Sequence, residues 1–530
     1  DTAMTTSDQA AAEAGHVALL EQPFGLLSDL IRFNAQARPH SPALIKDDEV
    51  LTYGALDVLM DQIAASLQRD GVQPGEAISI CAGSSVAYAA TFLGALRAGV
   101  AVAPLAPSST PESLAVMLAD CGAKRFFLDR SVAKALEGIS LTMPLTALDG
   151  SDAGGSYEAW LAPAGSKPSP VTVTPAMPFN IIYSSGTTGT PKGIVQSHEM
   201  RWSHTGRGGG LGYGPGSVTL LSTPLYSNTT LVSFFPTMGM GGAAVLMDKF
   251  DALGFLKLSH QHRVTHAMLV PVQYRRILEQ PTFGDYDLSS FQMKFCTSAP
   301  FGAALKADIL KRWPGGLIEY YGMTEGGGSC GLIAHEHPDK LHTVGQPLPG
   351  HDVRLIDEEG RELPAGEIGE VVGRSPAMMN GYHNQPGKTA EAEWISPEGL
   401  RYIRTGDVGR FDEEGFLTLM DRKKDMIISG GFNIYPSDLE SVIVGHPAVL
   451  EAAVVGALSD RWGETPVAFV TLKAGATATA DEVRDWANAK LGKTQRLAAL
   501  KLMDVLPRSA IGKVLKRELR DQFMAEETVA

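Results

Sequence analysis

Cysteine is scarce in this sequence of 530 residues, and its few copies stand far apart. The four cysteines are Cys81, Cys121, Cys296 and Cys330, and no two of them show the CxxC spacing of zinc or redox sites. The spacing argues against a disulfide framework and against a cysteine-based zinc site. Isolated thiols are typical of a reducing compartment, so we expect a cytoplasmic protein.

Positive charge is also in short supply. The chain has 45 Lys and Arg against 59 Asp and Glu, a formal net charge of −14. A nucleic-acid-binding protein needs a basic face for phosphate contacts, so this balance argues against nucleic acid as a partner. Small anionic ligands need only a local positive site, and residues 484–520 contain ten Lys and Arg but three Asp and Glu.

A long uninterrupted apolar run is missing as well. The longest apolar stretch, residues 86–106, is rich in Ala and Gly and contains Arg97 and Pro104. A membrane-spanning helix needs about 20 consecutive apolar residues, so we expect a buried helix and strand here and no integral membrane segment. Residues 1–15 lack the apolar run of a signal peptide and are predicted to form a loose N-terminal segment.

The patterns that are present alternate between strand and helix. They predict a helix over 54–70, a strand over 77–81, a helix from about 84, a strand over 100–102, a helix from 111 and a strand over 125–128. The alternation recurs from 179 to about 325, which indicates an α/β fold of sheets layered with helices. Short strands with Gly, Pro and acidic turns then predict a β-rich subdomain over about 345–420. We expect a large domain over 16–423 and a small, mobile α+β domain over 424–530.

The most informative segment is Tyr183–Gly193, with the sequence YSSGTTGTPKG, which follows an apolar strand pattern. Glycines let a backbone wrap closely around phosphate, and the hydroxyl groups and Lys192 add donors and a positive charge. The segment is not a Walker A loop, because Pro191 stands in place of the second glycine and Gly193 in place of the Mg²⁺-binding hydroxyl residue. It predicts a phosphate site of a different kind.

This segment closely resembles the phosphate loop of the acyl-adenylate-forming superfamily, which includes acyl-CoA synthetases, nonribosomal peptide adenylation domains and beetle luciferases. Four more family motifs occur in the family's order: YGMTE at Tyr321–Glu325, YIRTGD at Tyr402–Asp407, DRKKDMIISGGFNIYP at Asp421–Pro436 and PRSAIGK at Pro507–Lys513. On five ordered motifs over nearly the whole chain, the protein is identified as a member of this superfamily. The resemblance implies two half-reactions: a carboxylate attacks the α-phosphorus of ATP to give an acyl-adenylate and pyrophosphate, and a thiol then displaces AMP.

The resemblance also implies roles for single residues. Lys513 would bridge the carboxylate and the α-phosphate, Thr324 would contact the α-phosphate, and Glu325 would hold Mg²⁺ as a hard oxygen ligand. Asp407 would accept both ribose hydroxyls, and Arg422 would reach the ribose or a phosphate. The other expected ATP- and AMP-binding residues, including an adenine cradle with Tyr320 or Tyr321 as its stacking wall, are Ser184, Ser185, Gly186, Thr187, Thr188, Gly189, Lys192, Ser298, Ala299, Pro300, Glu319, Tyr320, Tyr321 and Gly322.

For the thiol and the acyl group the resemblance implies two further sets of residues. Lys424 would be the hinge between the adenylating and thioester-forming poses. The expected CoA-binding residues are Ser429, Gly430, Gly431, Trp462 and Arg496, and the expected acyl-pocket residues are Tyr226, Ser227, Thr229, Met323, Gly326 and Gly327. Many relatives have a gate histidine where Ser227 stands, and the small residues after Glu325 predict room for a sizeable acyl group. His198 and His204 are interpreted as forming local hydrogen bonds rather than as catalytic groups.

Together these observations predict an AMP-forming carboxylic acid:CoA ligase that uses ATP, Mg²⁺ and CoA. Within the superfamily, the sequence most resembles the 4-coumarate-type and 4-chlorobenzoate-type ligases. A benzoate- or hydroxycinnamate-like acid and a medium-chain fatty acid both fit, because apolar pockets discriminate weakly between such groups. The alternative is a stand-alone enzyme that loads an acyl group onto a carrier-protein phosphopantetheine; 17 residues follow Lys513, so we expect no carrier domain fused behind it. A homodimer stays open as the assembly.

Overall fold

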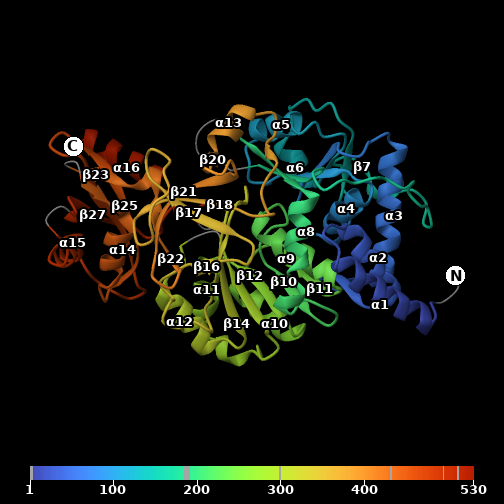
Figure 1. Ribbon diagram of the computed structural model, residues 1–530, viewed down its shortest axis with the longest axis horizontal. Helices are drawn as coiled ribbons and strands as arrows, with labels where there is room; N and C mark the ends of the chain where they lie inside the picture. Colours follow the sequence, from blue (N-terminus) through green and yellow to red (C-terminus); the bar gives the residue numbers. More distant parts are fainter. Residues whose placement is uncertain are drawn as a thin grey trace.

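The computed structural model describes residues 4–183, 191–297, 300–429, 432–492, 495–509 and 513–529. Figure 1 shows a large body that contains the N-terminal and central parts of the chain, and a smaller C-terminal domain at the left. The predicted fold class, a large α/β domain with a β-rich subdomain and a small C-terminal α+β domain, is confirmed.

The first large sheet has eight strands in the order β19-β9-β8-β4-β3-β5-β6-β7. The strands are β3 (Ala77–Cys81), β4 (Ala101–Pro104), β5 (Phe126–Leu128), β6 (Leu145–Ala147), β7 (Gly155–Ser156), β8 (Pro178–Tyr183), β9 (Gly193–Ser197) and β19 (Gly381–Tyr382). Strands β3 to β8 pair in parallel, and the continuous burial of β3 and β4 suits strands covered on both faces. Next to the edge strand β19, β9 pairs antiparallel with β8 and places Gly193 opposite Tyr183, at the two ends of the predicted phosphate segment.

The second large sheet has nine strands in the order β16-β15-β14-β13-β12-β10-β11-β1-β2. The strands are β1 (Pro42–Lys46), β2 (Glu49–Thr52), β10 (Val218–Leu221), β11 (Ala243–Leu246), β12 (His266–Leu269), β13 (Met293–Cys296), β14 (Gly316–Tyr321), β15 (Cys330–Ile333) and β16 (Gln346–Pro347). The strands from β1 and β11 through β14 are parallel, so β13 and β14 end at the same edge. Ligands of open α/β sheets bind at that edge, and the YGMTE motif begins there.

Helices cover and separate the two sheets. They are α1 (Thr6–Leu20), α2 (Leu27–Ala37), α3 (Tyr53–Arg69), α4 (Val86–Arg97), α5 (Pro111–Asp120), α6 (Arg130–Ala135), α7 (Tyr157–Trp160), α8 (His198–Gly206), α9 (Asn228–Met240), α10 (Ala252–Gln261), α11 (Pro271–Leu278) and α12 (Ala303–Arg312), with short 3₁₀ turns η1 (Gly209–Leu211) and η2 (Phe283–Asp285). The rings of Phe92 on α4, Phe179 on β8 and Phe235 on α9 lie 4.9 to 6.4 Å apart, centroid to centroid, in the core between the sheets. None of the described helices has the length and apolar character that a membrane crossing requires.

The N-terminal segment is ordered, so the prediction of a loose segment over residues 1–15 is wrong from Thr6 onward. Thr5 and Asp8 form a reciprocal capping box that starts α1. Farther along the helix, His16 Nε2 lies 2.6 Å from the carbonyl oxygen of Gly239, and both Ala12 and His16 are buried. The cap and this packing stabilise a helix whose small, polar composition resembles that of a flexible end.

The β-rich subdomain is a five-stranded antiparallel sheet. Its strands are β17 (Asp352–Ile356), β18 (Gly369–Arg374), β20 (Glu393–Ile395), β21 (Arg401–Phe411) and β22 (Leu417–Arg422), with α13 (Pro386–Glu391) beside them. Three of them, β17, β18 and β22, lie where the sequence predicts short strands, at 353–357, 369–373 and 416–420; β20 and β21 were not predicted. The long strand β21 pairs with β22 and puts Asp407 opposite Arg422, so two of the predicted nucleotide-binding residues are neighbours by register.

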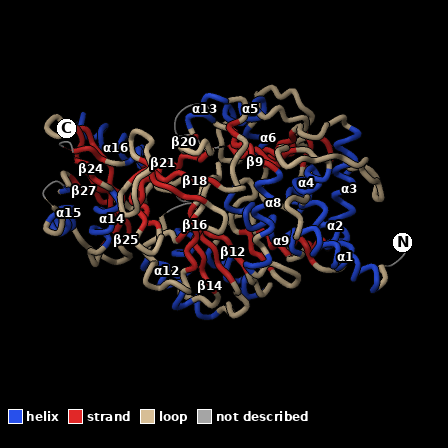
Figure 2. Tube along the Cα trace, viewed as in Figure 1, coloured by secondary structure: helices blue, strands red, loops and turns tan. Residues whose placement is uncertain are grey.

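The C-terminal domain has its own sheet, drawn in red at the left of Figure 2, in which β26 pairs with β23, β25 and β27. Its elements are η3 (Lys423–Asp425), β23 (Ile427–Ser429), β24 (Phe432–Ile434), α14 (Pro436–Val444), β25 (Val449–Ser459), β26 (Gly463–Leu472), α15 (Ala480–Asn488), β27 (Ala499–Leu502) and α16 (Lys516–Val529). Two apolar clusters pack on the sheet, one under α14 and α15 and the other under α16. The domain therefore has a core of its own, and the 3₁₀ turn η3 joins it to β22.

Candidate active site

The YGMTE motif forms a tight turn at the end of β14, and Glu325 is held in that turn from two directions. Its carbonyl oxygen accepts from the Met379 amide at 2.8 Å, and its Oε2 accepts from the Tyr382 hydroxyl at 2.9 Å. The ammonium of Lys192 lies 4.6 Å from the centre of the same Tyr382 ring. Tyr382 therefore connects the predicted metal ligand to the cation of the predicted phosphate segment, although nothing in the sequence marked this tyrosine.

A buried polar network supports the same turn from behind. Gln196 on β9 donates at 2.7 Å to the carbonyl oxygen of Thr324 and at 3.3 Å to Asn228 Oδ1. Arg201, fully buried on α8, donates at 2.9 Å to the same Asn228 oxygen and at 3.0 Å to Asn180 Oδ1. The network joins the first sheet, α8 and the start of α9 to Thr324. None of its supporting side chains was predicted, although an amide within the apolar strand GIVQS was a usable signal.

Asp407 occupies a half-buried position surrounded by donors. Its Oδ2 accepts from the Tyr321 hydroxyl at 2.6 Å, and its Oδ1 lies 3.6 Å from Arg422 Nε. Burial raises the pKa of Asp407, while the hydrogen bond from Tyr321 and the charges of Arg422 and Lys513 oppose that rise. The carboxylate is thus positioned by two motif residues, and the predictions for Asp407, Arg422 and Tyr321 fall on one cluster.

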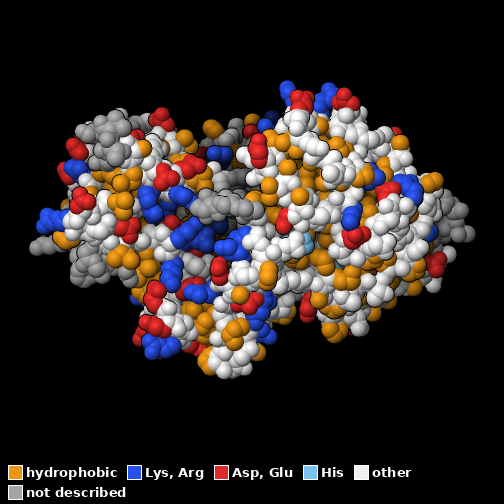
Figure 3. All heavy atoms as spheres, turned by 90° about the horizontal axis from the view of Figure 1, so that it is seen from above, with side chains coloured by type: hydrophobic (Ala, Val, Ile, Leu, Met, Phe, Trp, Pro, Cys, Tyr) orange, Lys and Arg blue, Asp and Glu red, His pale blue; other side chains and the backbone are white. Residues whose placement is uncertain are grey.

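Lys513 reaches this cluster from the C-terminal domain. It closes a short hairpin in which Ser509 N donates to the Lys513 carbonyl at 2.8 Å. Its side chain still meets solvent, but the protein around it lowers the pKa of Lys513 by desolvation; Arg422 lowers it further, and Asp407 and Glu325 oppose this. Four separate motifs therefore meet in one electrostatic neighbourhood. Figure 3 shows Lys and Arg side chains gathered on the upper face where the C-terminal domain joins the large one.

A carboxylate of the C-terminal domain fastens this arrangement to the large domain. Glu451 Oε1 on β25 lies 2.7 Å from Arg275 Nη1 on α11 and also pairs with Arg508, at the base of the Lys513 hairpin. The Arg275 and Glu451 side chains are 26 % and 16 % exposed. This three-residue interaction, Arg275–Glu451–Arg508, is called the interdomain latch below.

The expected adenine cradle is placed only in part. Glu319 points away from it, because its side chain is buried in an ion pair with Lys306, and burial raises the pKa of Glu319 to about 7. The Glu319 carboxylate therefore already has a partner, and a nucleotide contact of Glu319 stays a prediction. The next side chain, Tyr320, stacks on Phe295 with 5.9 Å between ring centroids, and Pro300 is exposed beyond the end of β13. Gly322 follows β14, where a Cβ would lie 2.7 Å from Ser329 Oγ.

The expected acyl-pocket residues flank the YGMTE turn. Ser227 and Thr229 are buried at the start of α9, Met323 lies within the turn, and Tyr226 hydrogen-bonds to Ser108. Gly326 has a φ of +75°, and a Cβ there would lie 2.1 Å from the Ala377 carbonyl oxygen. For Gly327, whose φ is +108°, the nearest atom is the Gly373 carbonyl oxygen at 2.9 Å. The glycines therefore let two backbones approach, and the expectation that they leave room for a large acyl group is wrong at these two positions.

The expected CoA-binding residues lie on the C-terminal domain. Ser429 pairs with Gly463, which brings it beside Trp462 at the β25–β26 turn, where the Arg461 guanidinium lies 4.6 Å from the Trp462 ring. Trp462 is 47 % exposed, and Arg496 is exposed before β27. No described contact joins Arg496 to the other two. Lys424, the expected hinge residue, is exposed in η3 and contributes to the electrostatic surroundings of Lys513.

Several predicted residues lie outside the described residues. They are Ser184, Ser185, Gly186, Thr187, Thr188, Gly189, Ser298, Ala299, Gly430 and Gly431.

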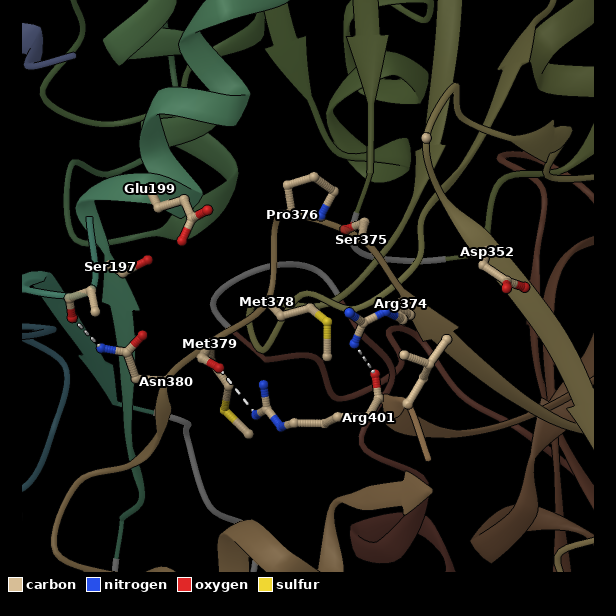
Figure 4. A pocket seen from close by; sticks show the side chains of 13 residues that line it. Ser197, Glu199, Asp352, Arg374, Ser375, Pro376, Met378, Met379, Asn380 and Arg401 are labelled. Atoms are coloured by element: carbon tan, nitrogen blue, oxygen red, sulfur yellow. Dashed lines mark hydrogen bonds between the residues drawn. The ribbon is translucent and has the colours of Figure 1, made fainter. Parts of the chain in front are cut away.

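A cavity of about 700 Å³ adjoins the active site. Figure 4 shows Ser197 and Glu199 at the start of α8 on one side of it, with Arg374, Met378 and Arg401 facing them. The segment 374–380 that borders this cavity also carries the Met379 amide bonded to Glu325. The described lining residues include none of the predicted site residues, so this cavity is separate from the predicted binding positions.

The fold and site define a two-domain enzyme in which a C-terminal lysine meets a nucleotide-binding motif at the edge of a sheet. Residues 31–383 match the family model "AMP-binding enzyme" and residues 438–513 match "AMP-binding enzyme C-terminal domain". The chain belongs to this AMP-binding enzyme family, and the prediction of an AMP-forming acid–thiol ligase is confirmed at that level.

Known relatives are similar along almost the whole chain. The chain is 32 % identical over 504 residues to the fatty acid–[acyl-carrier-protein] ligase ScoC of Streptomyces coeruleorubidus, covering 93 % of this chain and 96 % of the relative. It is 32 % identical over 498 residues to a feruloyl-CoA synthase of an Amycolatopsis species, covering 92 % and 97 %. The solved structure of the amide bond synthetase McbA from Marinactinospora thermotolerans superposes with a TM-score of 0.84 at 27 % identity, covering 94 % and 99 %.

Proposed function

We propose that this enzyme is an AMP-forming carboxylic acid:CoA ligase with its first half-reaction centred on Lys513, Asp407 and Glu325. The single observation that carries the proposal is that these side chains, from three separate motifs and two domains, share one electrostatic neighbourhood. Adenylation builds negative charge at phosphorus, so pre-positioned cations and donors supply most of the catalysis.

In the first half-reaction Lys513 lies between the substrate carboxylate and the α-phosphate. Asp407 accepts the ribose hydroxyls, and its carboxylate is kept available by Tyr321 and Arg422. The Thr324 hydroxyl contacts the α-phosphate while Gln196 holds the Thr324 backbone. Each of these three motif residues, Lys513, Asp407 and Thr324, is thus assigned one contact with the substrates.

Glu325 is the residue we assign to Mg²⁺. Mg²⁺ is commonly held by one or two carboxylates together with substrate phosphates, so a single fixed carboxylate suits it. The Tyr382 hydroxyl bonded to Oε2 sets the orientation of that carboxylate. When bound, the cation would neutralise charge on the ATP phosphates.

The second half-reaction needs Lys513 to leave and a thiol to enter. We assign η3, with Lys424, as the hinge, and Ser429 and Trp462 as contacts of the incoming CoA. The domain limits of 16–423 and 424–530, the cytoplasmic location and a homodimer stay predictions.

A carrier-protein thiol is the second candidate acceptor. It is favoured by the similarity to ScoC, whose name states a fatty acid and an acyl-carrier protein as substrates. For the acid substrate we keep the two classes that the sequence predicts, aromatic acids and medium-chain fatty acids.

The test is a panel of carboxylic acids assayed for AMP release with CoA, with a phosphopantetheinylated carrier protein and with neither thiol. AMP release that requires CoA supports the proposal. Release that requires the carrier, or that needs no thiol, contradicts CoA as the acceptor. If no acid of the panel supports the exchange of pyrophosphate into ATP, that result would contradict adenylation itself.

A further inference from the structure

Arg207, at the C-terminal end of α8, is a half-buried cation without a counter-charge. It forms no ion pair and no side-chain hydrogen bond with any residue that the structure describes. Burial lowers the pKa of Arg207, and the Tyr320 hydroxyl is the group that opposes this. The end of a helix favours a cation, but that dipole does not satisfy the planar fork of donors that a guanidinium carries.

Two imidazoles, those of His204 and His351, and the Tyr320 hydroxyl interact electrostatically with this guanidinium. The Ser329 amide donates at 2.9 Å to His351 Nδ1, so the His351 ring carries its proton on Nε2 and can donate there. His204, one turn before Arg207, has a buried Nδ1 with no partner among the described residues. Burial lowers the pKa of His351 to about 4 and that of His204 well below its usual range, so both rings are neutral near pH 7. The expectation that His204 forms a local hydrogen bond is wrong for Nδ1.

This cluster lies along one face of α8 beside the YGMTE turn: a Cβ at Gly326 would lie 2.9 Å from Met200 Cε, and His204 and Arg207 follow Met200 on the same face of the helix. Tyr320 precedes the turn on β14, and Gly331, opposite Tyr320 on β15, follows Ser329 by two residues. Tyr321, the neighbour of Tyr320 on the strand, faces the opposite side of the sheet and donates to Asp407 there. The acyl part of a substrate bound beside Thr324 would run along this face of α8 toward Arg207.

We propose that the far end of the acyl pocket is an anion subsite, in which Arg207, assisted by His204 and His351, binds a second carboxylate of the substrate. The inference rests on the proposed ligase activity and narrows its substrate class to dicarboxylic acids. A guanidinium matches a carboxylate with two parallel hydrogen bonds, and an apolar chain end would leave this buried cation without a partner. The specificity-determining group is thus Arg207, with the two imidazoles as neutral donors or acceptors at its sides.

The test compares matched acids in the AMP-release assay: terephthalate against 4-methylbenzoate, and adipate against hexanoate. We expect the dicarboxylate to have the higher kcat/KM in at least one pair, by about 10- to 100-fold, the range for a charge-assisted hydrogen bond. Arg207→Met should abolish that preference, and Arg207→Lys should keep part of it. The control, Arg276→Met, changes an exposed arginine on α11 and should keep the wild-type ratio.

The ratio of two acids on one enzyme preparation is independent of how much of a variant is folded. Equal or better use of the monocarboxylate in both pairs would overturn this inference and leave the ligase activity standing. An unchanged acid preference in Arg207→Met would overturn the role of Arg207. No AMP release with any acid would overturn the proposed function, and this inference with it.

Discussion

The interdomain latch predicts that adenylation can be weakened without touching a residue of the active site. The change is Arg275→Met, which keeps the apolar stem and removes the guanidinium that lies 2.7 Å from Glu451. Glu451 stays paired with Arg508, so the substitution creates no isolated buried charge. The variant therefore removes one contact between the domains, together with the 3.9 Å pair that Arg275 makes with the exposed Glu279 one turn along α11.

The size of the effect follows from the geometry of that contact. The pair is short and mostly shielded, with 26 % and 16 % of its side chains exposed. The free energy that this pair contributes should lie between that of an exposed ion pair and that of a buried charge-assisted hydrogen bond. We therefore assign it about 1–2 kcal/mol. That free energy corresponds to roughly a 5- to 30-fold change in the population of the pose that brings Lys513 to Asp407.

The assay measures the two half-reactions separately. Pyrophosphate exchange into ATP should fall by up to this factor, while thioester formation from supplied acyl-AMP should be unchanged or faster. Added salt should narrow the difference between wild type and variant, because it screens the remaining charge interaction. Arg276→Met is the matched control on the same helix. Equal changes in both half-reactions, or none in either at an unchanged melting temperature, would refute the latch.

Three further predictions concern single side chains. Lys513→Ala should reduce pyrophosphate exchange by more than 100-fold, on the order of the loss of one transition-state cation, yet keep most thioester formation from acyl-AMP; near-normal exchange would contradict its assignment. Tyr382→Phe should lower the affinity for Mg²⁺ about tenfold, as for other groups that orient a metal ligand, so that more Mg²⁺ is needed for half-maximal activity. An unchanged Mg²⁺ titration would count against this role. Burial raises the pKa of Asp421 to about 6 from an ordinary 3.8, so proton uptake stabilises the folded protein as the pH falls from about 6 to 4. Asp421→Asn should flatten that part of the melting-temperature profile, and a profile identical to wild type would disprove the contribution.

The motifs predicted the catalytic positions better than the contacts that hold them. Asp407 and Arg422, each predicted from its own motif to contact the nucleotide, lie opposite each other because the register of β21 and β22 pairs them. Gln196 and Tyr382 were not predicted, since their roles depend on partners 128 and 57 residues away in the chain. Local patterns carry no record of such distances. The same limit explains Glu319, whose side chain faces Lys306 because neighbouring strand residues point to opposite faces.

Two expectations were wrong for reasons of packing. Small residues at Gly326 and Gly327 read as open space, but the chain at 373–377 fills that space with backbone. The first 15 residues read as loose by composition, but a capping box and the contact of His16 with Gly239 order them as a helix. In both cases the deciding neighbour comes from a distant part of the sequence.

The short strand β19 has a consequence for the order in which the molecule can assemble. It adds residues 381–382 to the edge of the first sheet, beside β9, although the other strands of that sheet end at Ser197. During synthesis the edge of β9 therefore stays unpaired until the β-rich subdomain is being made. Tyr382, on the same strand, follows its partner Glu325 by 57 residues. The strand that completes the sheet thus also orients the proposed metal ligand. The site therefore cannot take its final form on a nascent chain that ends before Tyr382.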